Sequence, residues 1–131
     1  YIDTNIWVDL FLDRRGPRGE PLGIFAADLL ASIKYNDGQI VVSDMLTNEL
    51  EGLGLLGDFN AFTSGYLCIT LSMDDHKYKD AQRLMRDFNL HAADAAHAVL
   101  AHDSDSILVT RDNHFRLVEG FIESFAPEDL I

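Results

Sequence analysis

One stretch of the chain decides the fold, HAADAAHAVLAHDSDSILVTRD at residues 91–112. Its first half, His91 to His102, is apolar nearly all round, as in a helix that is buried against a sheet. Its second half, Ser106 to Thr110, has the length and composition of a buried strand. Asp94 lies in the first turns of this helix, and Asp112 lies just past this strand. A helix followed at once by a strand predicts one unit of a parallel α/β sheet.

The rest of the chain repeats this alternation. Expected strands are Tyr1–Asp3, Gln39–Val42, Tyr66–Leu71, Ser106–Thr110 and Phe121–Phe125, and expected helices are Asn5–Leu12, Leu22–Tyr35, Ser43–Leu53, Phe59–Thr63, Asp74–Phe88 and His91–His102. The predicted fold class is therefore α/β, a three-layer α/β/α sandwich with a mostly parallel central sheet. A chain of 131 residues that is 47% hydrophobic has the size of a single domain with one core, so residues 1–131 are expected to form one domain.

Two further expectations concern the core. The helix at 74–88 has apolar residues at helical spacing, which form its expected buried face: Tyr78, Ala81, Leu84, Met85 and Phe88. The only cysteine, Cys68, lies in an apolar strand, where we expect it to pack in the core. A single cysteine allows no internal disulfide, which fits a reducing, cytoplasmic setting.

Composition excludes several classes of function. Ten Lys and Arg residues against 22 Asp and Glu residues give a formal net charge of −12, which opposes general attraction to nucleic acid and to anionic membranes. No apolar run approaches the roughly 18 to 20 residues that span a bilayer, so we expect a soluble protein. Because the chain starts at Tyr1 without methionine, inside an expected strand, we also expect that a few residues precede it.

Four acidic residues are expected to meet at one edge of the sheet. Asp3, Glu49, Asp94 and Asp112 each lie at the end of a strand or in the first turns of the helix beyond it. Ligands of open α/β sheets bind at this edge. Carboxylates gathered there repel one another unless a cation is present. Mg²⁺ or Mn²⁺ is the expected cation, because hard divalent metals prefer oxygen ligands and hydrolyse phosphodiesters from such sites.

Each of these carboxylates has an alternative role. Asp3 could cap the following helix, and Asp94 could be an anion favoured near a helix N-terminus. Glu49 competes with Glu51, but helical geometry places Glu49 at the edge of the buried face and Glu51 about 140° from Leu46 at its centre. A glutamate on a buried face needs a partner, since an unpaired buried charge is costly, and a metal supplies one.

Other polar residues near these positions are candidates for supporting roles. Asn5 adds hydrogen-bonding groups to the turn of Asp3, and Thr110 can bond the loop of Asp112 and hold the rotamer of its carboxylate. Asp9 is a possible outer ligand but is more often part of a solvated face. Zinc is not favoured at His91 and His97, because imidazoles six positions apart on a helix diverge.

Taken together, the chain resembles the PIN-domain family of metal-dependent ribonucleases, particularly the small VapC-like toxins of toxin–antitoxin pairs. The resemblance covers essentially the whole chain. It rests on Ile2-Asp3-Thr4-Asn5, on Ser43 with Thr47 and Glu49, on His91-Ala-Ala-Asp94-Ala-Ala-His97-Ala98, on Thr110-Arg-Asp112-Asn-His-Phe115, and on the ending Ala126-Pro127-Glu128-Asp129-Leu130. The motifs are individually short, but their order and spacing match the family.

The resemblance implies an activity and a site. Asp3, Glu49, Asp94 and Asp112 would be the catalytic, metal-binding quartet, supported by Asn5 and Thr110. The expected reaction is attack of an activated water on the phosphorus of single-stranded or looped RNA, which leaves a 3′-hydroxyl and a 5′-phosphate. Because the chain is strongly acidic, RNA binding would depend on the metal and on local basic residues, of which the nearest are Arg14, Arg15, Arg18 and Arg111.

The resemblance also implies partners. The family forms homodimers and is silenced by a small antitoxin whose tail enters the acidic cleft. The apolar segment Leu53–Phe62 is a candidate contact surface.

Other functions stay open at this point. The chain could be a PIN-fold nuclease that processes RNA outside toxin–antitoxin systems, or an interaction protein with a non-catalytic acidic pocket. A phosphorelay receiver would need an aspartate at the end of the third strand, but this strand ends in Leu71-Ser72-Met73.

Overall fold

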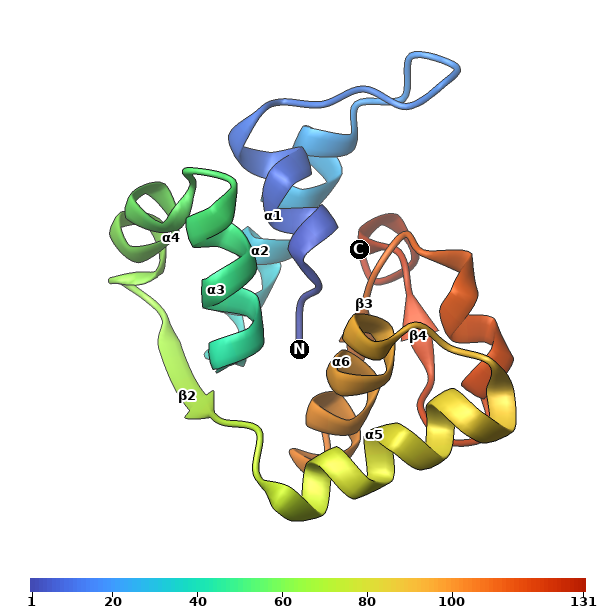
Figure 1. The fold of residues 1–131 in the computed structure, drawn as a ribbon. Helices are drawn as coiled ribbons and strands as arrows, with labels where there is room; N and C mark the ends of the chain where they lie inside the picture. The colour runs from blue at the N-terminus through green and yellow to red at the C-terminus, as the bar shows by residue number, and fades with distance from the viewer.

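The computed structural model describes residues 1–131 and shows the expected alternation of helices and strands (Figure 1). The helices are α1 (Thr4–Phe11), α2 (Leu22–Tyr35), α3 (Asp44–Gly52), α4 (Leu56–Thr63), α5 (Asp75–Phe88) and α6 (Ala92–Asp103), with 3-10 helices η1 (Asn113–Val118) and η2 (Pro127–Asp129). The strands are β1 (Gln39–Ser43), β2 (Leu67–Leu71), β3 (Leu108–Val109) and β4 (Ser124–Phe125). None of the helices combines the length and the apolar character needed to cross a membrane.

The strands all pair in parallel, but they form two separate pairs. β1 pairs with β2, and β3 pairs with β4. The strand predicted at Tyr1–Asp3 is reduced to one parallel bridge between Ile2 and Val109. The bridge is closed by the N–H of Asp3, which donates to the carbonyl of Val109 at 2.9 Å, and by the N–H of Val109, which donates to the carbonyl of Tyr1 at 2.8 Å. No backbone hydrogen bond joins this segment to β1.

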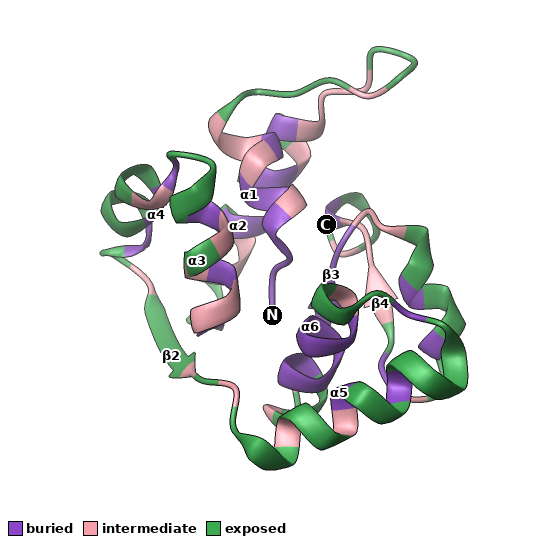
Figure 2. Ribbon diagram, in the orientation of Figure 1, coloured by how far each residue is buried: buried purple, intermediate pink, exposed green.

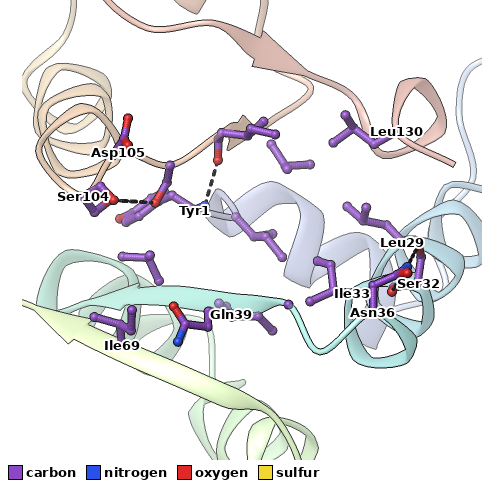
Figure 3. Close-up of a pocket in the computed structure, with 17 residues that line it drawn as sticks. Tyr1, Leu29, Ser32, Ile33, Asn36, Gln39, Ile69, Ser104, Asp105 and Leu130 are labelled. Atoms are coloured by element: carbon purple, nitrogen blue, oxygen red, sulfur yellow. Dashed lines mark hydrogen bonds between the residues drawn. The ribbon is translucent and has the colours of Figure 1, made fainter.

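A pocket of about 500 Å³ lies where the two strand pairs separate. Its lining includes Tyr1, Ile107 and Gln39, and Figure 3 shows Tyr1 and Gln39 on opposite sides of it. The backbone nitrogen of Tyr1 donates to the carbonyl of Ile107 at 2.8 Å at this place. None of the four acidic residues lines this pocket, so it is separate from the predicted site.

Side chains that alternate along the strands pack against two different layers of helices. One hydrophobic cluster joins Tyr1, Val41 and Leu108 to apolar residues of α5 and α6. A second cluster joins Ile2, Ile40, Val42 and Val109 to apolar residues of α1, α2, α3 and α4. Because successive strand residues point to opposite faces, helices cover both faces of the strands. The predicted α/β class with helices on both sides is confirmed, and Figure 2 shows α6 buried along most of its length, as its sequence predicts.

Two predictions about the core were wrong. On α5 only Ala81 and Leu84 are buried, whereas Tyr78, Met85 and Phe88 are 54%, 37% and 44% exposed. The reason is that α5 packs on α6 with one narrow face and turns the rest outward (Figure 2). Cys68 is exposed rather than buried, because β2 is an edge strand that only β1 pairs.

The apolar face of α2 provides a test of this core. Leu30 is fully buried, whereas Ile24 of the same helix is 51% exposed. Leu30→Ala should lower the free energy of unfolding by about 2 to 5 kcal/mol, because it leaves a cavity between α2 and the strands. Ile24→Ala is the matched control and should stay within about 0.5 to 1 kcal/mol of the parent protein. Urea unfolding measures both, and equal losses would contradict this packing of α2.

Candidate active site

The four acidic residues gather where the parallel strands end. Asp3 follows the bridge at Ile2 and caps α1, its carboxylate accepting the N–H of Thr4 at 2.7 Å. Asp112 follows β3 and caps η1. Glu49 comes from α3, which begins directly after β1, and Asp94 lies in the first turn of α6. The capping role that was an alternative for Asp3 is therefore present, and it leaves one carboxylate oxygen free for other contacts.

Two polar side chains fix the carboxylate of Asp3. The hydroxyl of Thr110 donates to Asp3 Oδ2 at 2.7 Å, and the amide of Asn5 donates to the same oxygen at 3.3 Å. Thr110 Oγ1 also accepts the backbone N–H of Asp112 at 3.0 Å. Thr110 thus bonds the loop of Asp112 as predicted, but the carboxylate that it holds is that of Asp3. A threonine has a single hydroxyl proton, and this proton is given to Asp3.

The carboxylate of Glu49 is held at both oxygens. His97 Nε2 lies 2.7 Å from Oε1, and the hydroxyl of Thr4 donates to Oε2 at 2.6 Å. Burial would raise the pKa of Glu49, but the hydrogen bonds from His97 and Thr4 outweigh burial and hold this pKa below its ordinary value. Glu51 is exposed, so the helical-face argument that separated the two glutamates is confirmed.

Asp94 and Asp112 meet around an imidazole that the sequence analysis did not single out. His114 Nδ1 lies 3.1 Å from Asp112 Oδ1 and 3.5 Å from Asp94 Oδ2. These three side chains offer ligand atoms that all lie within 4.8 Å of one another. The sequence signal for His114 was its position two residues after Asp112. The 3-10 helix that Asp112 caps brings the His114 side chain back toward the Asp112 carboxylate.

The two halves of the cluster interact through Asp3. Burial raises the pKa of Asp3, and the nearby charge of Glu49 raises it further, while His97 and Thr110 oppose this shift. Burial also raises the pKa of Asp94, and the charges of Asp112 and Asp3 raise it further. Each of the four predicted carboxylates therefore interacts electrostatically with at least one of the others, and Asp94 and Asp112 are the two that share a close cluster with His114. Oxygen donors with one imidazole suit a hard divalent cation, so the residues present fit Mg²⁺ or Mn²⁺.

Histidines of α6 behave as their spacing predicts. His91 is exposed, with its ring centroid 5.8 Å from that of His114, whereas His97 is buried and faces Glu49 and Tyr1. The two imidazoles do not converge, which agrees with the argument against zinc.

The arginines near the site are mostly engaged within the protein. Arg111 Nε donates to Asp9 at 2.8 Å, and its Nη1 donates to Glu128 at 2.7 Å. Asp9 is 1% exposed and also lies 3.6 Å from Arg14, so its assignment to a solvated face was wrong. Arg111 was predicted to bind substrate, but its charge is already paired between α1 and η2. Arg15 lies exposed in the loop before α2.

Comparison with known proteins agrees with this geometry. Residues 58–120, which include Asp94 and Asp112, match the PIN domain family. The chain has a PIN-like fold. A solved toxin–antitoxin complex from Klebsiella pneumoniae is similar to this chain over 96% of this chain and 95% of that chain, with a TM-score of 0.66 and 18% sequence identity. No curated protein matches the chain in sequence.

These findings confirm the resemblance that the motifs predicted. The solved structure is similar over nearly the full length, so the fold that it shares with this chain includes Asp3 and Glu49, which lie outside the residues that match the family. PIN domains are typically nucleases, and the acidic cluster of this chain lies at the carboxyl ends of the strands, where α/β folds bind their ligands.

Because the pKa of Asp94 is raised, the thermal stability of the metal-free protein should depend on this residue and on pH. A carboxyl whose pKa is raised by folding favours the folded state below its ordinary pKa of 3.8, and this contribution is lost as the pH rises through the folded value. At pH 7 the charged Asp94 is therefore unfavourable. Asp94→Asn should raise the melting temperature of the chelator-treated protein by a few °C, about the shift for 1 kcal/mol in a domain of this size.

Thermal unfolding of the variant and the parent protein between pH 3 and pH 8 provides the measurement. The advantage of Asp94→Asn should shrink toward zero as the pH falls below the ordinary pKa. A variant that melts lower than the parent protein at pH 7 would instead make Asp94 a stabilising anion at the N-terminus of α6.

Proposed function

We propose that this protein is a metal-dependent endoribonuclease and the toxin of a toxin–antitoxin pair. The observation that carries the proposal is the convergence of four carboxylates, those of Asp3, Glu49, Asp94 and Asp112, with no Lys or Arg side chain bonded to any of them. Burial is the main cause of the raised pKa of Asp3 and of Asp94, and neighbouring carboxylates raise both further, so the charged cluster is costly by itself. A bound cation would remove this cost.

Mg²⁺ or Mn²⁺ would be held by Asp3, Asp94 and Asp112, with Glu49 at the edge of the site. When bound, the ion would lower the pKa of a water molecule and neutralise charge on the phosphate. The residues of the chain would bind the ion, and neighbouring residues orient the carboxylates that bind it. Thr110 and Asn5 fix the carboxylate of Asp3, and the N–H of His114 fixes that of Asp112 at 2.9 Å.

The burial of the carboxylates favours a flexible substrate. The Asp3 side chain is 10% exposed and that of Asp94 is 18% exposed, so a phosphate must approach closely to reach them. Single-stranded or looped RNA can splay its backbone in this way, whereas a regular duplex is stiffer. The imidazole of His114 is 58% exposed beside Asp94 and Asp112, where it can contact an approaching phosphate.

The proposed partners are a second copy of the chain and a small antitoxin in the cytoplasm. The similar fold in a toxin–antitoxin complex supports an antitoxin. A net charge of −12 suits a basic tail, and an arginine in such a tail could bond two of the carboxylates at once. In the segment Leu53–Phe62, Phe59 is buried while Leu53 and Phe62 are 57% and 36% exposed, which leaves apolar surface for a contact.

Cleavage of RNA is the central prediction. The purified protein should cut single-stranded RNA with Mg²⁺ or Mn²⁺ and stop when a chelator is added. Asp3→Asn, Asp94→Asn and Asp112→Asn should each reduce the rate by orders of magnitude, because each keeps the size of the side chain and removes a ligand charge. Gel electrophoresis of an end-labelled RNA measures the rate, with circular dichroism to confirm the fold.

Glutamates of α3 supply the matched control. Glu49→Gln should reduce cleavage, whereas Glu51→Gln should cut RNA at the parent rate because Glu51 is exposed away from the cluster. Full activity of Asp94→Asn would overturn the proposed site. Tight RNA binding without cleavage by the parent protein, with metal present, would favour the alternative of a non-catalytic acidic pocket.

Association is tested separately. Sedimentation at micromolar concentration should show a dimer, and Phe62→Asp should shift it toward the monomer because a charge enters the exposed apolar segment. The small protein encoded next to this chain, when co-expressed, should co-purify with it and inhibit cleavage. A parent protein that sediments as a monomer and binds no such product would contradict the proposed partners while leaving the nuclease proposal intact.

A further inference from the structure

A chain of buried hydrogen bonds connects the core of the protein to Glu49. Ser43 Oγ lies 2.6 Å from the hydroxyl of Tyr1, and this hydroxyl lies 2.6 Å from His97 Nδ1. The other nitrogen of the same ring, Nε2, lies 2.7 Å from Glu49 Oε1. Ser43, Tyr1 and His97 are all buried. Four segments therefore meet in this relay: the first residues of the chain, the end of β1, α3 and α6.

The direction of each hydrogen bond in the relay follows from the chemistry of its ends. An ionised carboxylate can only accept, so the hydrogen on His97 lies on Nε2 and is donated to Glu49. In a neutral imidazole Nδ1 is then an acceptor, the hydroxyl of Tyr1 donates to it, and Ser43 donates to Tyr1. Burial would lower the pKa of His97, but the hydrogen bond to Glu49 and the charges of Asp3 and Glu49 outweigh burial and raise this pKa; in the protonated ring Nδ1 donates to Tyr1, and Tyr1 donates to Ser43. Burial raises the pKa of the Tyr1 hydroxyl, so Tyr1 keeps its proton in both states. Ser43 Oγ accepts the N–H of Leu46 at 3.1 Å. Every buried group of the relay then has a partner.

The relay ends on one particular rotamer of Glu49. A glutamate side chain has three rotatable bonds, and on a partly exposed helical face it samples many conformations. Here His97 holds Oε1 and Thr4 holds Oε2, so both oxygens are fixed from opposite segments. The fixed side chain lies beside Asp3, because His97 Nε2 is also 3.9 Å from Asp3 Oδ1. A buried histidine that served packing alone would not need to end on a site carboxylate.

We propose that Tyr1 and His97 are positioning residues that hold the carboxylate of Glu49 beside that of Asp3, an inference that rests on the proposed metal-dependent function. Neither residue touches the substrate. Tyr1 fixes the ring of His97 in one orientation, and the ring fixes Glu49. Loss of such outer partners of a ligand typically costs about 10- to 100-fold in metal affinity or activity.

Two Tyr→Phe variants test the relay. Tyr1→Phe removes the hydroxyl and keeps the ring that packs in the core. Tyr66→Phe is the matched control, because its hydroxyl donates to the carbonyl of Leu30 at 3.2 Å, outside the site. Titration calorimetry with Mn²⁺ alone measures the dissociation constant. Tyr1→Phe should weaken Mn²⁺ binding by about 10-fold, and Tyr66→Phe should leave it unchanged.

A second pair of variants separates positioning from packing. His97→Gln keeps an N–H that can reach Glu49, whereas His97→Leu removes it. His97→Gln should retain more Mn²⁺ affinity and a higher kcat than His97→Leu, with little change in KM, because the relay acts on Glu49 and not on RNA. In the metal-free parent protein, ¹⁵N NMR should find the His97 proton on Nε2, and Tyr1→Phe should shift the Nδ1 resonance.

The outcomes distinguish this inference from the function on which it rests. A parent protein that neither binds Mn²⁺ nor cuts RNA overturns the proposed function and the relay with it. A parent protein that does both, while Tyr1→Phe binds Mn²⁺ as tightly as Tyr66→Phe, overturns the relay alone. A His97 ring in the parent protein whose only proton is on Nδ1 also overturns it, as would equal losses for His97→Gln and His97→Leu.

Discussion

Repulsion between carboxylates that are partly removed from water is the constraint on which the rest of the site depends. Four acidic side chains lie at the ends of parallel strands, and burial and mutual charge raise the pKa of Asp3 and Asp94. The surrounding polar residues oppose this cost with hydrogen-bond donors. Thr110 and Asn5 serve Asp3, and Thr4 and His97 serve Glu49. None of these donors is a lysine or an arginine, so no permanent cation neutralises the cluster.

Most of the fold was predictable, because hydrophobic periodicity is a local property of the sequence. The helix at Leu22–Tyr35 was found with the predicted ends, and α6 is buried as its all-round apolar sequence predicted. Strand pairing depends on contacts between distant segments, which is why the division between β1 and Tyr1–Asp3 was not foreseen. The exposed apolar residues of α5 were missed for a related reason, since helical spacing defines a face but not how much of it is covered.

The candidate site divides in the same way. The four carboxylates could be predicted because each follows a strand or begins a helix, and Glu49 could be separated from Glu51 by helical geometry. The partners of these carboxylates could not be predicted. Tyr1 and His97 are 96 positions apart, and the sequence contains no sign that a phenol and an imidazole will meet. Arg111 was predicted to contact RNA because its sequence position is close to Asp112. Its ion pair with Glu128 depends on the fold of the C-terminal residues, which the sequence alone does not indicate.

The ion pairs of Arg111 have a consequence for how such sequences evolve. Asp9 is almost fully buried, and its charge is balanced by Arg111, which also bonds Glu128. Removing Arg111 would leave the buried Asp9 with only Arg14, which is 3.6 Å away and 51% exposed, and this costs more stability than replacing the buried pair together. Substitutions at Asp9 and Arg111 should therefore be inherited jointly among descendants of this sequence. Glu128, at the exposed end of the same chain of charges, is freer to drift.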